Sequence, residues 1–416
     1  MAASRATTND QCGNGGAGPG PGPSATPVVA VTTVVQVVVT MCSVIPAAIA
    51  PELARAFAVP TSLIGVQVSL IYLGAMATSL VSGVLIRRWG ALRTNQAGLA
   101  FSGVGVALMA TPSLFILAIG SVLTGFGYGL TNPAASHLLM RVTQPKTRNL
   151  VFSLKQTGVP LGGVAAGLTA PTLALVFGWQ WALLAGAALA LALLAIIQPF
   201  RRRWDQDRDP SVALRSNPAG DLRLVWRHPV LSRMSLVGFC YSAVQLSLTT
   251  FAVTMLVEEL DFGLVEAGVV LSVLLVAGAT GRLVWGGVAD RLGDGNRVLM
   301  LTGLVAAAGG ALTVLLSAGA APAVVYGVLI LFGVSAIGWN GVFMAEVARL
   351  APEGQIGSAT GGVMVSTYAG VLVGPVTFAG AFALVGEYTA SFGLCAAVSL
   401  AGATLMLAAR RGMARG

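Results

Sequence analysis

Long apolar runs recur along the chain from Pro27 onward, separated by short polar turns and by one longer polar interruption over 200–231. A helix of about 20 residues crosses the hydrocarbon core of a bilayer, and the runs are of that order of length. We therefore predict an all-α membrane protein with twelve transmembrane helices, over 27–50, 62–86, 94–112, 114–140, 149–177, 180–199, 232–257, 264–289, 297–317, 321–348, 356–385 and 388–409.

The longer interruption divides the predicted helices into two groups of six. We expect an N-terminal bundle over 27–199, a linker over 200–231 and a C-terminal bundle over 232–409. Residues 1–26 are rich in Gly, Pro, Ala and Ser, so we predict a disordered tail there. Residues 410–416 are expected to form a second, short tail.

The composition excludes most soluble classes of protein. Only 9% of the 416 residues are charged and 56% are hydrophobic, whereas soluble domains carry about 25% charged residues. The chain contains no H-E-x-x-H, G-x-S-x-G or G-x-x-x-x-G-K-[ST] pattern, which argues against an enzyme and against an ATP-driven pump. No cysteine spacing indicates a metal site, and we expect no cofactor.

A net charge of +9 would suit a nucleic-acid partner, but the positions of the charges along the chain argue against one. With both termini in the cytoplasm, nearly all Lys and Arg residues fall in loops on that side; Arg55 lies outside, and Lys155 and Arg282 lie within spans. This is the positive-inside pattern, and such loops face anionic lipid headgroups. We predict a multi-pass protein of a bacterial plasma membrane, acting as a monomer on a small-molecule substrate, with the lipid bilayer but no nucleic acid as partner.

The second half of the chain repeats motifs of the first. The segment Gly83–Gly90 at the end of the second span recurs as Gly286–Gly293 at the end of the eighth, and Asn132 in the fourth span recurs as Asn340 in the tenth. Repeats related by an axis along the membrane normal are one known transporter architecture, in which the substrate site lies near mid-membrane between the halves.

These motifs resemble those of the major facilitator superfamily, whose loop signature reads roughly G-x-L-a-D-R-x-G-r-[KR]. The eighth span matches it through Gly286, Asp290, Arg291 and Gly293. The second span matches it through Gly83, Arg88 and Gly90, but Arg87 stands where the signature has Asp. The resemblance implies two pseudo-symmetric six-helix bundles that rock around a central site, which is the mechanism of a secondary transporter.

The resemblance also implies a latch on the cytoplasmic side. Its loop carboxylate approaches the positive N-terminus of a helix in the other half, a contact that contributes about 0.3–1 kcal/mol. We assign this role to Asp290, facing the start of the fifth span, with the surrounding signature residues as part of the latch. Arg87 leaves the matching latch of the first half in doubt. The alternative for Asp290 is an ordinary solvated loop charge.

Arg282 and Lys155 are the candidate anion-binding residues, because a charge within a span costs about 2.5–3.5 kcal/mol on insertion scales. Arg282 lies eight residues before Asp290, and its guanidinium fork matches a carboxylate. A Gly-Arg pair in the eighth span also resembles anion and carboxylate carriers of the superfamily. The fifth and eighth spans face each other in that architecture, so Lys155 could complete a clamp. The alternatives are pairing with a helix carbonyl and snorkelling to the interface.

Other polar residues in the predicted spans are candidates for orienting the substrate, although each could instead form a hydrogen bond between helices. They are Gln36, Asn132, Gln156, Tyr241, Gln245 and Asn340. His137 and Glu346 are the candidates for proton coupling. Glu346 lies three residues before Arg349, which also suits a structural ion pair.

We therefore predict a secondary transporter of a small organic or inorganic anion, such as a carboxylate. The alternative is an exporter of drugs or amphipathic metabolites, because the fifth and eleventh spans carry Gly-Pro patterns that resemble the antiporter signature of such exporters. Those patterns also suit a closely packed interface helix. A sensor is disfavoured, because no long segment remains for a soluble output domain.

Overall fold

A computed structural model describes residues 24–214 and 218–413, which form helices and connecting turns without a strand. The first half contains α1 (Ala25–Ala48), α2 (Ala50–Phe57), α3 (Thr61–Ser79), α4 (Ser82–Trp89), α5 (Ala91–Met109), α6 (Leu114–Val142), α7 (Arg148–Gln156), α8 (Gly158–Phe177), α9 (Trp179–Ile196) and α10 (Arg201–Trp204). The second contains α11 (Pro218–Arg227), α12 (Pro229–Glu258), α13 (Leu264–Leu292), α14 (Gly295–Val314), α15 (Pro322–Ala336), α16 (Asn340–Leu350), α17 (Ile356–Val385) and α18 (Tyr388–Met413).

All twelve predicted runs are helical, but three of them are interrupted. The second run bends by 55° between α3 and α4, the fifth divides into α7 and α8, and the tenth divides into α15 and α16. The apolar pattern predicted continuous helices here, because hydropathy does not report where a backbone bond is missing. In the fifth run the break precedes Pro160, which has no N–H for the helical ladder.

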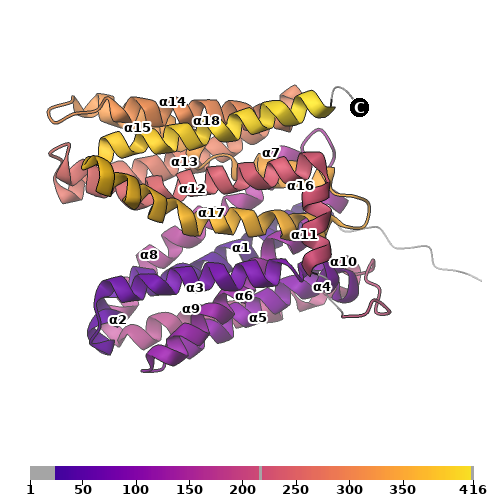
Figure 1. Cartoon of the computed structure of the whole chain (residues 1–416). Coiled ribbons are helices and arrows are strands. Elements are labelled where there is room, and N and C mark those ends of the chain that lie inside the picture. Colours follow the sequence, from indigo (N-terminus) through magenta and orange to yellow (C-terminus); the bar gives the residue numbers. More distant parts are fainter. Residues whose placement is uncertain (1–23, 215–217, 414–416) are drawn as a thin grey trace, which may run out of the picture.

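Ten helices of the described chain are long and apolar enough to cross a membrane, when α7–α8 and α15–α16 count as one each, and the bent pair α3–α4 would be an eleventh. The remaining predicted span is α5. It packs along α6 and α9 (Figure 1) but carries four consecutive polar residues near its start, Arg93–Gln96. This polar first part explains why α5 is less apolar than the other spans.

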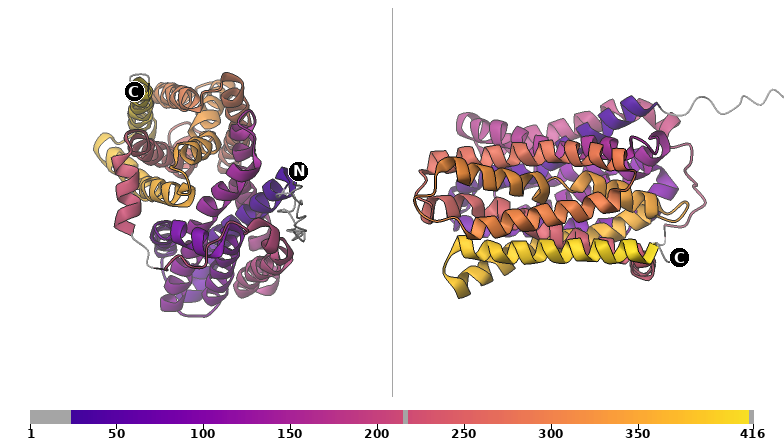
Figure 2. Two further views of the ribbon diagram at one scale, coloured as in Figure 1. Left: turned by 90° about the vertical axis from the view of Figure 1, so that its right-hand side faces the viewer. Right: turned by 90° about the horizontal axis from the view of Figure 1, so that it is seen from above.

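The helices form two groups that lie side by side (Figure 2). The described chain begins and ends at the same end of the molecule, where α10 and α11 also lie (Figure 1). We call this the linker end and the opposite one the far end. At the linker end α7 packs against α13 and α16, and α17 packs against α4, whereas α8 packs on α1 and α9 of its own half. The halves are therefore closed on each other toward the linker end.

Two glycines permit this close approach. A Cβ atom on Gly83 of α4 would lie 2.0 Å from Oγ of Ser358 on α17, and one on Gly286 of α13 would lie 2.5 Å from Oγ of Ser153 on α7. Both distances are shorter than any van der Waals contact. The two repeats of the loop signature thus place a glycine at each contact between the halves.

The predicted termini and linker are partly outside the described residues. The tail expected over 1–26 lies outside them up to residue 23, and α1 begins at Ala25. The tail expected over 410–416 is helical up to Met413, because α18 continues, and 414–416 lie outside. The predicted linker contains α10 and α11, with 215–217 outside the description.

Candidate functional site

A cavity of about 90 Å³ lies between the two halves. Five of the predicted binding residues line it: Asn132, Gln156, Gln245, Arg282 and Asn340. The rest of the lining comprises Tyr72, Tyr128, Val159, Ser242, Leu246, Trp339, Met364, Thr367, Tyr368 and Val371. The structure therefore brings residues of spans 2, 4, 5, 7, 8, 10 and 11 to one place.

Arg282 is the charged side chain of this lining and is only 1% exposed. Its Nη1 donates to the backbone carbonyl of Gln156 in the other half. That carbonyl lacks its helical donor because the residue four positions later is Pro160. The break in the fifth span thus supplies the acceptor for a guanidinium of the eighth.

A second interrupted span holds the same side chain. Nε of Arg282 donates to the carbonyl oxygen of Ile337 at 3.2 Å, at the end of α15 where the tenth span breaks. The C-terminal ends of helices carry partial negative charge, which favours a cation there. Nη2 of Arg282 makes no hydrogen bond within the described part of the chain. The two carbonyls therefore fix the guanidinium and leave one of its nitrogens for a ligand.

Lys155, only 3% exposed, lies behind the cavity wall rather than in it. Its Nζ donates to three amide oxygens: Oε1 of Gln36 at 2.7 Å, Oδ1 of Asn132 at 2.5 Å and Oε1 of Gln156 at 3.2 Å. The partners come from α1, α6 and α7. Each acceptor is neutral, so Lys155 brings a buried positive charge without a counter-ion in its shell.

Lys155 also decides which way the cavity amides face. An ammonium group can only donate, so the amide oxygens must turn toward it. The amide nitrogens of Asn132 and Gln156, both of which line the cavity, are then available as donors. Gln36 lies farther back, where its Nε2 donates to Thr40 at 3.2 Å.

The second half repeats this arrangement with different residues. Oε1 of Gln245 accepts from Nε1 of Trp339 at 3.1 Å and from Nδ2 of Asn340 at 2.9 Å. The nitrogen of the Gln245 amide is therefore also left as a donor. Tyr241, predicted here, lies outside this cavity: its hydroxyl donates to the carbonyl of Leu299 at 2.8 Å.

The candidates for proton coupling lie at the linker end instead. Nε2 of His137 is 2.6 Å from Oδ2 of Asp207, and Glu346 pairs with Arg349 at 2.6 Å, as the spacing of that pair predicts. Neither His137 nor Glu346 lines the central cavity. Among the described residues, no carboxylate lines it either.

Three tyrosines that the sequence did not single out surround the cavity. Tyr72 of α3, Tyr128 of α6 and Tyr368 of α17 have ring centroids 5.8–6.0 Å apart. The Tyr368 hydroxyl is buried close to Asn132 without a hydrogen bond of normal geometry. Isolated tyrosines in apolar runs are indistinguishable from core residues, so only their convergence reveals this cluster.

Asp290 contacts the start of the fifth span, as the resemblance implies. Its Oδ1 accepts the N–H of Asn149 at 2.9 Å and Nδ2 of the same residue at 3.0 Å, and its Oδ2 accepts the N–H of Leu150 at 2.9 Å. The two backbone N–H groups belong to the first turn of α7 and have no helical acceptor. The carboxylate thus joins α13 of one half to α7 of the other.

Arg87, which replaces the signature Asp, lies at the matching place in the first half. Its Nη1 donates to Oγ of Ser358 at 3.4 Å, in the first turn of α17. Asp221 of the linker helix α11 lies beside both Arg87 and Ser358. Burial raises the pKa of Asp221, while the Ser358 hydroxyl and the Arg87 charge act in the opposite direction.

The remaining signature residues lie around these contacts. Arg88 donates to the carbonyls of Pro210, at 2.9 Å, and Val212 in the linker. Gly90 and Gly293 end α4 and α13 with φ of +96° and +63°, which favours glycine. Arg291 is exposed.

Comparison with known proteins gives the family. The Major Facilitator Superfamily model matches residues 32–375. An uncharacterized MFS-type transporter of Mycobacterium tuberculosis is 25% identical over 366 residues, 86% of this chain and 79% of that protein. The 3-(3-hydroxy-phenyl)propionate transporter of Escherichia coli is 28% identical over 251 residues, 58% of this chain and 59% of that protein.

Solved structures agree on the fold. The crystal structure of the Escherichia coli fucose:proton symporter superposes with a TM-score of 0.74 at 16% identity, covering 92% of this chain and 99% of that one. At this identity the likeness speaks for the fold alone. The family match, together with this fold, identifies a multi-pass membrane protein and a secondary transporter rather than an enzyme. The chain belongs to the Major Facilitator Superfamily.

Proposed function

We propose that the protein transports a small organic anion, and that an aromatic carboxylate is its substrate class. The observation that carries this proposal is the donor excess of the central cavity. Arg282 and the amide nitrogens of Asn132, Gln156 and Gln245 can all donate into it, and Lys155 adds a second positive charge behind the wall. A carboxylate would satisfy these donors, whereas a cation would meet only repulsion from the buried charges.

The aromatic part of the proposal rests on the tyrosine cluster. Rings of Tyr72, Tyr128 and Tyr368 approach the same cavity as the Arg282 guanidinium. A flat ring with a carboxylate at one edge fits such a site, because aromatic rings pack edge to face or offset on one another. The relative that carries 3-(3-hydroxy-phenyl)propionate takes a substrate of this chemistry.

The arrangement of the halves fits alternating access. We place the linker end in the cytoplasm of a bacterium, from the basic loops there, so the conformation described is closed to the cytoplasm and its central site belongs to the outward side. The cavity of about 90 Å³ is smaller than ligand pockets of about 300–1,000 Å³. Substrate must therefore widen it, so that binding and movement of the halves are linked in one monomer.

Two contacts at the linker end act as latches in this proposal. Asp290 holds the first turn of α7. In the first half Arg87 stands where the signature has Asp. There Asp221 of α11 provides a carboxylate instead, next to the first turn of α17. The linker helix thus becomes part of the gate, because the carboxylate comes from α11 rather than from the signature loop.

The exporter alternative rested on Gly-Pro patterns of the fifth and eleventh spans, and in the eleventh span packing accounts for the glycines. A Cβ on Gly370 would lie 2.2 Å from the carbonyl oxygen of Phe239, and one on Gly374 would lie 2.5 Å from that of Ala243. Both glycines let α17 approach the backbone of α12. This supports the interpretation as a closely packed interface helix.

Thermal unfolding of the purified protein tests the substrate class. We would add 3-phenylpropionate, inorganic phosphate, a neutral sugar and the lipophilic cation tetraphenylphosphonium in turn. A ligand at 100 times its dissociation constant adds about 2.7 kcal/mol of stability. We expect the aromatic carboxylate to raise the unfolding temperature most, and Arg282→Gln to remove that rise.

Arg233→Gln is the matched control. Arg233 also donates to a helix carbonyl, that of Ala408 at 3.0 Å, but far from the cavity lining. The proposal predicts that this variant keeps the stabilisation by the carboxylate. Stabilisation by tetraphenylphosphonium instead, unchanged in Arg282→Gln, would favour the exporter and leave Arg282 with a structural role.

A further inference from the structure

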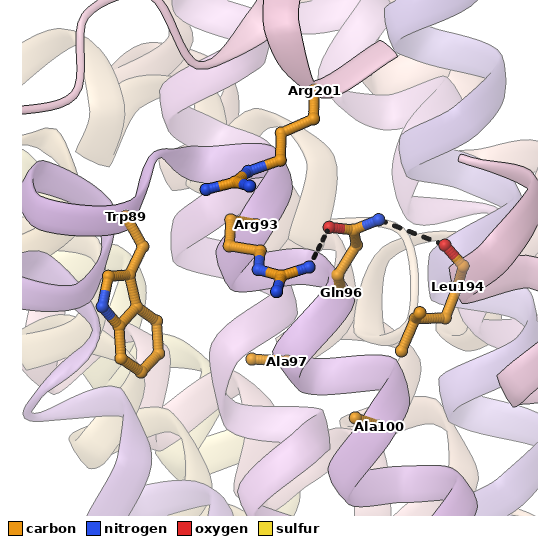
Figure 3. Close-up of a pocket in the computed structure, with 7 residues that line it drawn as sticks. All are labelled: Trp89, Arg93, Gln96, Ala97, Ala100, Leu194 and Arg201. Atoms are coloured by element: carbon orange, nitrogen blue, oxygen red, sulfur yellow. Dashed lines mark hydrogen bonds between the residues drawn. The ribbon is translucent and has the colours of Figure 1, made fainter. Parts of the chain in front are cut away.

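A second pocket, of about 540 Å³, opens at the linker end of the first half, apart from the central cavity. It lies between the start of α5, the end of α9 and α10 (Figure 3). Arg93 and Arg201 form its charged rim, with Trp89 beside them. Figure 3 shows both guanidinium groups on the same side of Ala97 and Ala100, which belong to an apolar wall.

The position of Arg93 over this pocket is held by a buried side chain. Nη1 of Arg93 donates to Oε1 of Gln96 at 3.1 Å, and Gln96 is only 1% exposed. The Gln96 amide in turn donates to the carbonyl of Leu194 at 3.1 Å and to Oε1 of Gln198 at 2.8 Å. The Gln96 amide of α5, fixed against the end of α9, therefore aims the guanidinium, which is otherwise exposed.

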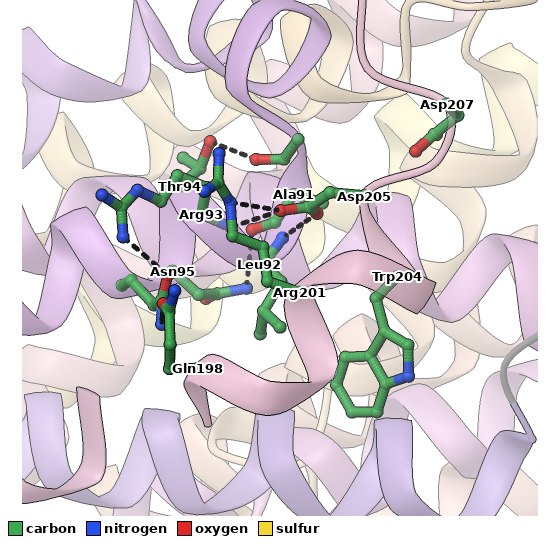
Figure 4. A network of polar contacts seen from close by, with 12 residues as sticks. Ala91, Leu92, Arg93, Thr94, Asn95, Gln198, Arg201, Trp204, Asp205 and Asp207 are labelled. Carbon is green, nitrogen blue, oxygen red and sulfur yellow. Dashed lines mark hydrogen bonds and ion pairs between the residues drawn. The ribbon is translucent and has the colours of Figure 1, made fainter. Parts of the chain in front are cut away.

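The rim carries more positive than negative charge. The nearby carboxylate, Asp205, accepts the N–H of Leu92 at 2.7 Å and the N–H of Arg93 at 3.0 Å (Figure 4). Nε of Arg201 lies 4.0 Å from Oδ2 of Asp205. Because the first turn of α5 engages both carboxylate oxygens, the two guanidinium groups are left with spare donors that face the same opening.

The apolar wall continues from this rim along α5 toward the far end. Ala97 and Ala100 line the pocket, and Phe101 and Val104, 38% and 47% exposed, follow on the same face at helical spacing. A charged rim followed by an apolar stripe matches a molecule with an anionic head and a hydrocarbon chain. A free inorganic anion would use only the rim.

We propose that this pocket binds an anionic glycerophospholipid, with its phosphate between Arg93 and Arg201 and an acyl chain along the α5 stripe. Guanidinium forks match phosphate oxygens, and basic pockets between helices at the membrane surface suit such headgroups. Trp89 also lines the pocket, and tryptophan side chains favour the headgroup level of a membrane. A lipid bound here would join α5, α9 and α10 at the point where the linker leaves the first half.

The test measures binding of phosphatidylglycerol to the full chain in detergent, with phosphatidylcholine as the neutral comparison, by native mass spectrometry. Each basic side chain near an anionic group contributes roughly a factor of five to the affinity. We expect Arg93→Gln combined with Arg201→Gln to weaken phosphatidylglycerol binding about thirtyfold, with little change for phosphatidylcholine. Arg202→Gln combined with Arg203→Gln removes the same charge from neighbouring exposed positions outside the lining and should leave binding nearly unchanged.

Two further arms separate the possible outcomes. Ala97→Leu combined with Ala100→Leu fills the wall but keeps both arginines, and should weaken lipid binding even if the arginine variant fails to fold. Inorganic phosphate and glycerol 3-phosphate should compete only weakly with the lipid. Equal loss in the Arg202 and Arg203 variant, retention in both pocket variants, or full competition by inorganic phosphate would each overturn the lipid site.

Discussion

Nη1 of Arg282 donates to the carbonyl oxygen of Gln156, across the boundary between the two halves. This carbonyl has no helical donor because Pro160, four residues later, has no N–H. A proline in one half therefore creates the acceptor that positions a guanidinium of the other half beside the cavity. The same contact links the local chain geometry of the fifth span to the charge of the candidate binding site.

Lys155→Met should weaken anion binding about tenfold without lowering stability. A unit charge several ångströms from the ligand contributes about 1–2 kcal/mol at an effective dielectric constant near 20. Burying a cation without a counter-ion is costly, so its removal offsets the lost bonds to three amides. Titration of an aromatic carboxylate by tryptophan fluorescence measures the first effect, and thermal unfolding the second.

Lys146→Met is the control, because Lys146 is the other lysine of the chain and lies exposed in a loop. It should change neither quantity. If Lys155→Met destabilises the protein strongly and leaves anion affinity intact, Lys155 is a structural donor and takes no part in binding.

Asp290→Asn should shift the protein toward a form open at the linker end. The neutral amide cannot match a carboxylate at the N-terminus of α7, and such a contact contributes about 0.3–1 kcal/mol. The closed population should therefore fall by a factor of roughly two to five. Spin labels at Lys146 and Leu292, both exposed, would report the change as a longer distance component.

Glu353→Gln removes a carboxylate from an exposed turn at the same end and should leave the distance distribution unchanged. An unaltered distribution in Asp290→Asn would mean that Asp290 is only a solvated loop charge whose bonds are replaced by water.

The second latch makes a prediction about paired substitutions. Asp221→Asn should loosen the contact of α11 with Arg87, and Arg87→Asp should loosen it further by placing like charges together. Combining Arg87→Asp with Asp221→Asn restores one carboxylate beside the first turn of α17. The double variant should therefore close better than Arg87→Asp alone, as measured by spin labels on α4 and α17.

If the effects of Arg87→Asp and Asp221→Asn on closure simply add in the double variant, the latch is contradicted. Side chains that do not interact give independent changes, whereas coupled side chains give an interaction energy of about 0.5 kcal/mol or more.

The linker contact at Asp207 predicts a dependence on pH. Burial tends to raise the pKa of Asp207, but the hydrogen bond from His137 and the charges of His137 and Arg141 outweigh it and hold the pKa below its usual value. A lowered pKa stabilises the docked linker above the unfolded-state pKa of about 3.9, and this contribution disappears as the pH falls through the folded-state value. Solvent screening limits it to about 1 kcal/mol or less.

Hydrogen exchange in the linker tests this. At pH 7 the amide of Asp209, which donates to the carbonyl of Arg87 at 2.8 Å, should exchange faster in Asp207→Asn than in the native protein. At pH 3 the two should become similar. A difference that persists at pH 3 would show that the carboxylate charge of Asp207 is not what docks the linker.

The hydrophobic pattern predicts the helices well because a bilayer imposes one length on every span. The resemblance to the superfamily's loop signature also implied the partner of Asp290, which lies at the start of α7. The helix breaks at Thr157 and at Ile337–Trp339, and the bend between α3 and α4, escaped prediction. The break at Thr157 follows from the missing N–H of Pro160, and an average of hydropathy over a whole run conceals such interruptions.

The candidate site was predictable only where charge marks it. Arg282 and Lys155 stand out because ionisable residues are rare in spans. Whether each side chain lines the cavity or lies behind its wall depends on packing. Tyr72, Tyr128 and Tyr368 carry no such mark. Asp221 was not foreseen as a partner of Arg87, because a polar linker has no periodicity that places its side chains.

The central claim is that Arg282 serves an anionic substrate, and uptake into proteoliposomes tests it most directly. We would compare radiolabelled 3-phenylpropionate with its neutral amide, 3-phenylpropionamide, in the native protein and in Arg282→Gln, and correct both for leakage through protein-free liposomes. The account predicts protein-dependent uptake of the carboxylate but not of the amide, falling at least about tenfold in the variant, as for a lost charged hydrogen bond. Equal protein-dependent uptake of both compounds, or uptake of the carboxylate that survives Arg282→Gln, would contradict it.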